Sequence, residues 1–228
     1  MRGHSTVHLL TAMQHADGQF PSGGFAFSQG LEAASQLAAH LGGFDFAEFL
    51  HVQIRHRWTG SDRVALIRAY RLRGDLAALS VLDSEVEAST LTEGLRTGSR
   101  RNGSALLTAH ERIGTPRAGE YRNLVKAGSA LGHLSVVQGL VWQALELDET
   151  AAVAISGYQA ITSLTTAAVR LGLIGAIEAQ RLIAGSMPLV VDGCDVAVGD
   201  DEPLCSFVPL TEIAIASHGT TGQKLFSN

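Results

Sequence analysis

Apolar residues recur at helical spacing along almost the whole chain, and this periodicity is the feature that most limits the folds open to it. No segment alternates apolar and polar residues as a half-buried strand does, and no internal repeat has a fixed period. Helix start signals punctuate the pattern, because Asp45 forms a capping box with Glu48 and Asp148 precedes another periodic run. We therefore expect an all-α fold, a single-domain helical bundle with a flexible C-terminal tail.

The same start and stop signals predict where the helices lie. Gly60 is expected to end one helix and Ser61 to cap the next, while a long charged helix is expected to continue past three glycines. The main expected helices span residues 6–16, 28–41, 46–58, 61–73, 83–113, 117–128, 130–147, 149–171, 174–191 and 209–217. Within one domain of residues 1–228, we expect an N-terminal segment and turn (1–27), a helical core (28–191), and an acidic loop, short helix and partner-binding tail (192–228).

The stretch from Phe20 to Glu32 combines proline, glycine and aromatic residues in a chain that has few aromatics. Pro21 fixes one backbone angle, and the pair Gly23-Gly24 permits positive φ, so the chain is able to turn sharply there. Ser28 is expected to cap the following helix, with Glu32 in its first turn, where a carboxylate suits the positive helix end. The residues alone predict an aromatic-lined turn that enters a helix.

Charge and composition argue against several classes of protein. A net charge of −5 and a pI near 6.0 argue against nucleic-acid binding. Uncharged residues 127–145 and 150–169 approach the roughly 20 residues of a membrane span, but polar side chains such as Gln138 and Gln159 favour helices buried in protein. With two cysteines and no evident secretory signal, we expect a cytoplasmic location.

Small side chains are densest in residues 130–175, where Gly139 and Gly157 lie on predicted helices. Glycine in a helix costs about 1 kcal/mol relative to alanine, and close approach of another helix is the natural compensation. Two alternatives remain open here, namely core packing inside one subunit and a homodimer interface. The arginine-rich run between Arg55 and Arg73 is expected to be the solvated face of two helices.

The sequence offers no convincing catalytic, cofactor or metal motif. It contains no phosphate-binding loop, no dinucleotide fingerprint, and no His or Cys pattern typical of a metal site. The run Ala26–Gly30 is one residue short of a nucleophile elbow, which leaves a helical hydrolase using Ser28 as an alternative. We expect a binding module that is not an enzyme and needs no cofactor or resident metal.

Taken as a whole string, residues 20–32 resemble the N-terminal signature of the urease accessory protein UreF family. The matching residues are Pro21, Gly23, Gly24, Phe25, Ser28, Gly30, Leu31 and Glu32. Further segments resemble the family in the same order, and they are residues 92–103, 132–142, 157–172 with the basic Arg170, and 209–226. The tail departs from the usual pattern, because Ser217, Gly219, Gly222 and Lys224 replace an Arg, a Glu, a Tyr and an Arg, respectively.

The resemblance implies a urease maturation chaperone without chemistry of its own. Such a protein bridges a UreG-type GTPase and a UreD/UreH-type scaffold, regulates the GTPase and promotes nickel insertion into apo-urease. The resemblance also implies a homodimer. The implied partner-binding residues are Glu32, Arg170, His218, Lys224, Leu225 and Phe226. A UreF-like paralogue with other partners is the alternative that the altered tail keeps open.

Overall fold

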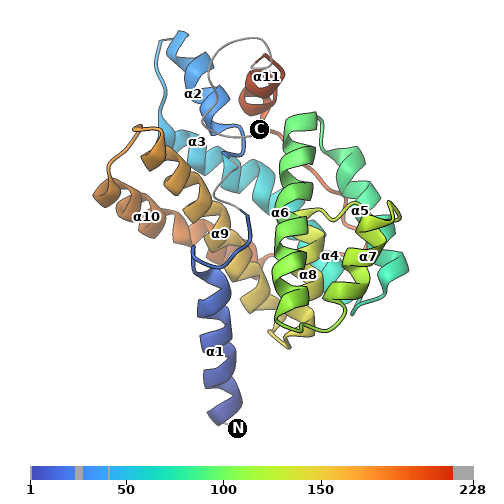
Figure 1. Cartoon of the computed structure of the whole chain (residues 1–228). Coiled ribbons are helices and arrows are strands. Elements are labelled where there is room, and N and C mark those ends of the chain that lie inside the picture. The colour runs from blue at the N-terminus through green and yellow to red at the C-terminus, as the bar shows by residue number, and fades with distance from the viewer. Residues whose placement is uncertain (1, 24–27, 41, 218–228) are drawn as a thin grey trace.

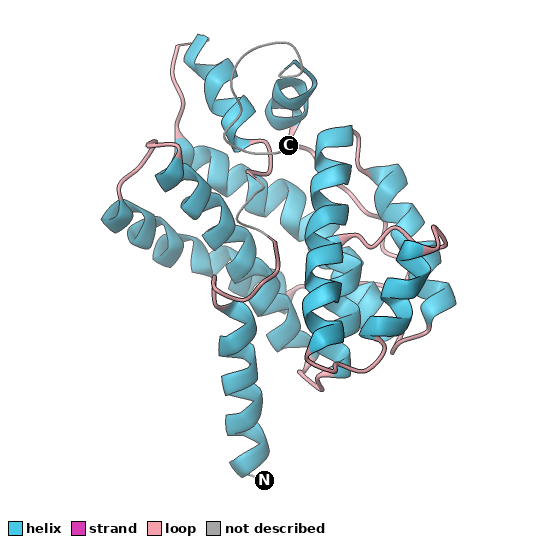
Figure 2. Ribbon diagram, in the orientation of Figure 1, coloured by secondary structure: helices cyan, strands magenta, loops and turns pink. Residues whose placement is uncertain are grey.

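The computed structural model describes residues 2–23, 28–40 and 42–217, and within these ranges it consists of helices and their connections, without a strand (Figures 1 and 2). The predicted all-α fold is confirmed. The elements are α1 (Arg2–Ala16), α2 (Leu31–His40), α3 (Phe46–Gln53), the π-helix η2 (Ile54–Asp62), α4 (Arg63–Arg71), α5 (Leu76–Ser89), α6 (Glu93–Arg112), α7 (Ala118–Lys126), α8 (Leu134–Ala144), α9 (Glu149–Arg170), α10 (Ala176–Asp195) and α11 (Pro209–Ser217).

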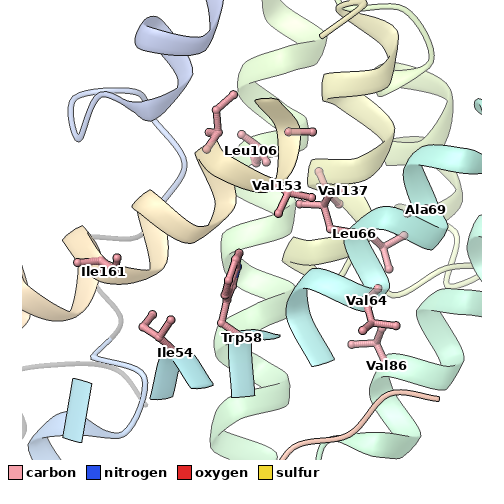
Figure 3. Packing of buried hydrophobic residues seen from close by; sticks show 14 of the residues in the cluster. Ile54, Trp58, Val64, Leu66, Ala69, Val86, Leu106, Val137, Val153 and Ile161 are labelled. Atoms are coloured by element: carbon pink, nitrogen blue, oxygen red, sulfur yellow. The ribbon is translucent and has the colours of Figure 1, made fainter. Parts of the chain in front are cut away.

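Helix α8 lies at the centre of the bundle and packs against α4, α6 and α9. All of its residues from 135 to 142 are buried. Figure 3 shows Val137 of α8 close to Leu66 of α4, with Val153 of α9 beside them. A helix that is uncharged and buried on every side requires neighbours all round, which explains its central position.

Two glycines allow the helices of this core to approach closely. A Cβ at Gly139 would lie 2.5 Å from the carbonyl oxygen of Leu66 in α4. A Cβ at Gly157 would lie 2.6 Å from Val190 of α10 and 2.8 Å from the indole of Trp58. Both positions face neighbours in the same chain, so the packing alternative is confirmed for them. Their interpretation as a homodimer interface is wrong.

Three aspartates cap helices as their positions in the sequence indicate. The Asp45 carboxylate accepts hydrogen bonds from the backbone N–H groups of Ala47 (2.8 Å) and Glu48 (3.1 Å) at the start of α3. Asp75 and Asp148 do the same for α5 and α9. Each cap satisfies backbone donors that have no partner within the helix.

Gly60 does not end a helix as predicted, because η2 continues α3 directly into α4. Its small size serves another purpose, since a Cβ there would lie 2.5 Å from the carbonyl oxygen of Cys205. The carbonyls of His56 and Gly60 accept hydrogen bonds from the N–H groups of Phe207 and Cys205, both at 2.9 Å. The segment before α11 therefore crosses η2 at close range.

The single charged helix expected over residues 83–113 is wrong, because the structure divides it into α5 and α6. Thr90 and Thr92 take extended backbone angles between them. The reversal brings Glu87 of α5 to Arg100 of α6, with 2.8 Å between the carboxylate and the guanidinium. Other boundaries shift too: α8 begins at Leu134, and α10 runs to Asp195, beyond the expected start of the acidic loop.

The predicted solvated arginine face is only partly correct, because Arg55, Arg71 and Arg73 are exposed but Arg63 of α4 is buried. Arg63 is 4% exposed, and its Nη1 donates to the carbonyls of Gly193 (2.6 Å) and Val196 (2.8 Å). Nη1 of Arg71 donates to the carbonyl of Val198 at 2.7 Å. These guanidinium groups satisfy backbone carbonyls at the C-terminal end of α10 and in the irregular segment that follows it, and they hold that segment against α4.

Helix α1 projects away from the rest of the bundle and touches it mainly at its C-terminal end (Figure 1). Four of its apolar side chains are 60–61% exposed, namely Val7, Leu9, Leu10 and Met13. The helix has no charged residue after Arg2. No helix in the described ranges is long and apolar enough to cross a membrane.

Candidate functional site

The motif that singles out residues 20–32 connects α1 to α2, and its glycines set its path. Gly23 has φ +78°, which confirms the predicted need for glycine at this turn. A Cβ on Gly23 would lie 2.9 Å from the Cβ of Ala105, so the loop rests directly on α6. Gly24 and Phe25 lie outside the described residues.

The second half of the motif rests on α11. Gln29 (φ 53°) and Gly30 (φ 84°) are both left-handed, and α2 begins after them at Leu31. A Cβ on Gly30 would lie 2.6 Å from Thr211 and 2.8 Å from Ile215. The prediction that Ser28 caps α2 is wrong, because these two left-handed residues separate it from the helix; its carbonyl accepts from the N–H of Leu31 at 3.0 Å.

The remaining motif residues are turned into the protein. Ser28 and Leu31 are 0% exposed and Glu32 is 2% exposed, although Glu32 does stand in the first turn of α2 as predicted. The Gln29 amide donates to the hydroxyl of Ser163 in α9 at 2.7 Å. The motif thus joins α6, α9 and α11, and buried Ser28 has no strand–turn–helix context for a hydrolase nucleophile.

A ring cluster fixes the junction between α1 and the motif. The imidazole of His15 stacks on that of His110 in α6, with 5.2 Å between ring centroids, and Phe20 lies against both rings. Burial lowers the pKa of His15, and burial together with the neighbouring His15 lowers the pKa of His110 to about 4. Both rings are therefore neutral at pH 7.

A cavity of about 150 Å³, lined by both polar and apolar groups, lies between this loop, η2, α6, α8 and α9. Two buried atoms among its lining residues have no hydrogen-bond partner in the described chain, namely Nη1 of Arg57 and Oγ of Ser135. Nε of Arg57 is 3.6 Å from the carboxylate of Asp62, whose pKa is raised by burial against the opposing effect of that guanidinium. The cavity is large enough for water or a small solute, and its described lining residues include no nucleophile paired with a base.

The candidate partner-binding residues do not form one cluster. Arg170 is exposed at the end of α9 and lines the cavity, whereas Glu32 is in the interior. His218, Lys224, Leu225 and Phe226 lie outside the described residues. Among the residues that the structure describes, no three His, Cys, Asp or Glu side chains are grouped so as to hold a metal ion.

Sequence reasoning missed a buried carboxylate that holds the backbone of residues 131–133, directly before α8. Asp83 is 0% exposed and accepts from the hydroxyl of Tyr121 (2.9 Å) and the N–H groups of Leu131 (2.7 Å), Gly132 and His133 (2.8 Å). The His133 imidazole then reaches Glu87 at 2.8 Å. A lone aspartate in an amphipathic helix gives no signal of this role, because its donors lie far away in the sequence.

Comparison with known proteins gives one consistent result. A family model described as UreF matches residues 43–187, which lie C-terminal to the motif loop. The chain is 31% identical to the urease accessory protein UreF of Trichodesmium erythraeum (strain IMS101), covering 96% of each chain. It is 30% identical to urease accessory protein UreF 1 of Brucella melitensis biotype 1, over 96% of this chain and 92% of the relative. It is 29% identical to urease accessory protein UreF of Bacillus sp. (strain TB-90), over 96% and 98%.

Proposed function

Because the chain belongs to the UreF family, we propose that it acts in urease maturation as a non-catalytic chaperone of the cytoplasm. The observation that carries this proposal is the similarity to urease accessory proteins over nearly the full length of both chains. The structure is compatible with it, because the motif loop joins helices through contacts such as the hydrogen bond from Gln29 to Ser163 of α9.

The proposed partners are a UreG-type GTPase, a UreD/UreH-type scaffold and apo-urease. The chain would bridge the first two, regulate GTP hydrolysis and promote nickel insertion, with nickel as cargo and not as a resident metal. Arg170 is the exposed candidate for direct contact. Glu32, being 2% exposed, would act indirectly by holding α2 and the motif in place.

We also propose a homodimer, on a basis other than the buried glycines. The exposed apolar residues of α1 lie on a helix that the described chain covers only near its end. Burying apolar surface contributes roughly 25 cal/mol of favourable free energy per Å², so a dimer in which a second copy covers these side chains would be stabilised.

The test of the proposed function is reconstitution. Apo-urease, nickel, bicarbonate, GTP and the two accessory partners from the same source are mixed with and without this chain, and urease activity is followed. We expect activation to require the chain, and we expect the chain alone to hydrolyse neither GTP nor simple esters. Partner capture without any gain in active urease would instead favour a paralogue with another task.

The C-terminal tail gives a separate prediction about scaffold binding. Deleting residues 219–228 removes Leu225 and Phe226, two apolar anchors expected to contribute about 1–3 kcal/mol each when buried in a partner. The truncated chain should keep its circular dichroism spectrum and bind the UreD/UreH-type scaffold at least tenfold more weakly, by about 1.4 kcal/mol. Replacing Ser227 and Asn228 by alanine is the matched control. Equal affinity of the truncated and full chains would show that the tail is not the docking element.

A further inference from the structure

A groove of about 870 Å³ runs along the outside of α6, on the opposite side of the motif loop from the cavity of about 150 Å³. Its floor is one face of α6, because residues 101, 104, 105, 108, 109, 112 and 113 recur at intervals of three and four. Its other wall is the loop that follows α1, with Phe20 and Pro21. The groove is open to solvent and is not part of the core.

The floor and wall of the groove are apolar at the centre. Ala105 and Ala109 leave room above α6, and Ile113 at one end is 59% exposed. The wall is held in place from behind, since Gly23 brings the loop onto Ala105 and Phe20 packs against the imidazole of His110. A groove formed in advance loses little conformational entropy when a partner enters it.

Two arginines mark the groove with positive charge. Arg101 and Arg112 are exposed on α6, and neither forms an ion pair in the described part of the chain. Arg96 and Arg100 on the same helix differ, because both are paired with Glu87 and Glu93. At 1.5 Å per residue, the two unpaired arginines are about 16 Å apart along the helix axis.

Asp17, the one carboxylate among the described residues that line the groove, forms no ion pair with either arginine. The Asp17 side chain accepts a hydrogen bond from the N–H of Gln19 at 2.9 Å, within its own loop. The chain also has no suitable occupant for the groove near either end. Residues 2–16 and 218–228 contain no Asp or Glu, so neither α1 of a second copy nor the tail complements the two arginines.

We propose that this groove docks an amphipathic segment of a urease-maturation partner, with apolar residues at its centre and carboxylates about three helical turns apart at its flanks. The apolar residues would cover Phe20, Ala105 and Ile113, and the carboxylates would pair with Arg101 and Arg112, which suit bidentate contact. The inference rests on the proposed function, because it gives that function a docking surface.

The test measures affinity for three purified probes: the UreG-type GTPase, the UreD/UreH-type scaffold and apo-urease from the same source. In the variant Arg101→Glu/Arg112→Glu, at least one probe should bind about tenfold or more weakly, and salt should weaken wild-type binding of the same probe. Arg55→Glu/Arg181→Glu is the matched control, since it reverses two exposed, unpaired arginines that do not line the groove. A second variant, Ser104→Trp, fills the floor from an exposed position and should weaken the same probe.

The outcomes separate this inference from the function on which it rests. If wild-type chain binds none of the three probes, the proposed function fails. If wild-type chain binds but both groove variants bind all three probes with unchanged affinity, the groove proposal alone is overturned. A photo-crosslinker placed at Ile113 gives an independent readout. Capture of a partner peptide containing Asp or Glu supports the proposal, whereas capture only of another copy of this chain overturns it.

Discussion

Helices α8 and α1 are both uncharged over most of their length, yet they have opposite surroundings. Residues 135–142 of α8 are all buried, whereas Val7, Leu9, Leu10 and Met13 of α1 are each about 60% exposed, at 60–61%. In α8, small residues such as Gly139 admit neighbouring backbones, and α4, α6 and α9 complete the enclosure. Helix α1 has no such enclosure among the described residues.

The contrast shows what an uncharged helix does and does not reveal. Lack of charge indicates that a helix is buried against other residues, but it does not indicate whether those residues belong to the same chain or to another one. Residues 130–175 suggested a homodimer because they were uncharged and rich in small residues. The structure packs Gly139 and Gly157 inside the subunit, and it leaves the apolar side chains of α1 exposed.

The largest effect is expected in the enclosed helix. Gly139→Ala places a Cβ 2.5 Å from the backbone carbonyl oxygen of Leu66 in the neighbouring helix α4. Because a helix backbone cannot shift as a side chain does, the substitution should lower the unfolding free energy by about 3 kcal/mol or more. The matched control is Gly185→Ala in α10, where a Cβ meets nothing within 4 Å. That substitution should stabilise by up to about 1 kcal/mol. Urea titration of both variants measures the difference in unfolding free energy. Equal stability of the two variants would show that α8 is not closely enclosed at position 139.

An intermediate effect is expected where α1 joins the bundle. Because the pKa of His110 is about 4 in the folded chain and 6.5 is its ordinary value, its neutral form is favoured by folding. This contribution is fully present above pH 6.5 and is lost as the pH falls toward 4, up to about 3 kcal/mol. The lowered pKa of His15 acts in the same direction.

The measurement is the pH dependence of unfolding free energy between pH 7 and pH 4. His110→Phe, which cannot titrate, should show a shallower loss of stability than the wild-type chain over this range. His51→Phe, at an exposed position outside the ring cluster, serves as the control. Identical slopes for wild type and His110→Phe would mean that the ring cluster does not hold the imidazole neutral.

The smallest effect on stability is expected on the exposed helix itself. Leu10→Ser/Met13→Ser should change the unfolding free energy of the subunit by no more than about 0.5 kcal/mol, because both side chains are mostly exposed. If a second copy covers α1, the same variant should shift the mass measured by light scattering from dimer to monomer. A wild-type chain that is monomeric at micromolar concentration would contradict the proposed homodimer, and α1 would then need another partner.

The sequence was sufficient for the fold class and for most helices, because those depend on local pattern. Caps such as Asp45 and Asp148 were predicted from their neighbours and are confirmed. The errors share a cause, since each depends on contacts between distant residues. Gly60 looks like a helix end in the sequence, but its small size is needed because the Cys205 carbonyl lies beside it. Ser28 looks like a helix cap, but the left-handed Gln29 and Gly30, the latter packed under α11, separate it from α2.

The candidate site was only partly predictable for the same reason. The motif was recognised and its turn at Gly23 is confirmed, but nothing local indicated that Glu32 would be buried. The role of Asp83 depends on the N–H groups of residues 131–133. The arginines of α4 were taken for a solvated face because their carbonyl partners, such as those of Gly193 and Val198, follow more than 100 residues later.

The path of the chain after α10 has a consequence for the order of events during synthesis. Gly30 near the N-terminus is covered by Thr211 and Ile215 of the last described helix. While the ribosome is still making α11, the motif has been exposed in the nascent chain but lacks one of its three supports. The nascent protein is therefore unable to present a finished motif loop until α11 has left the ribosome and packed against Gly30.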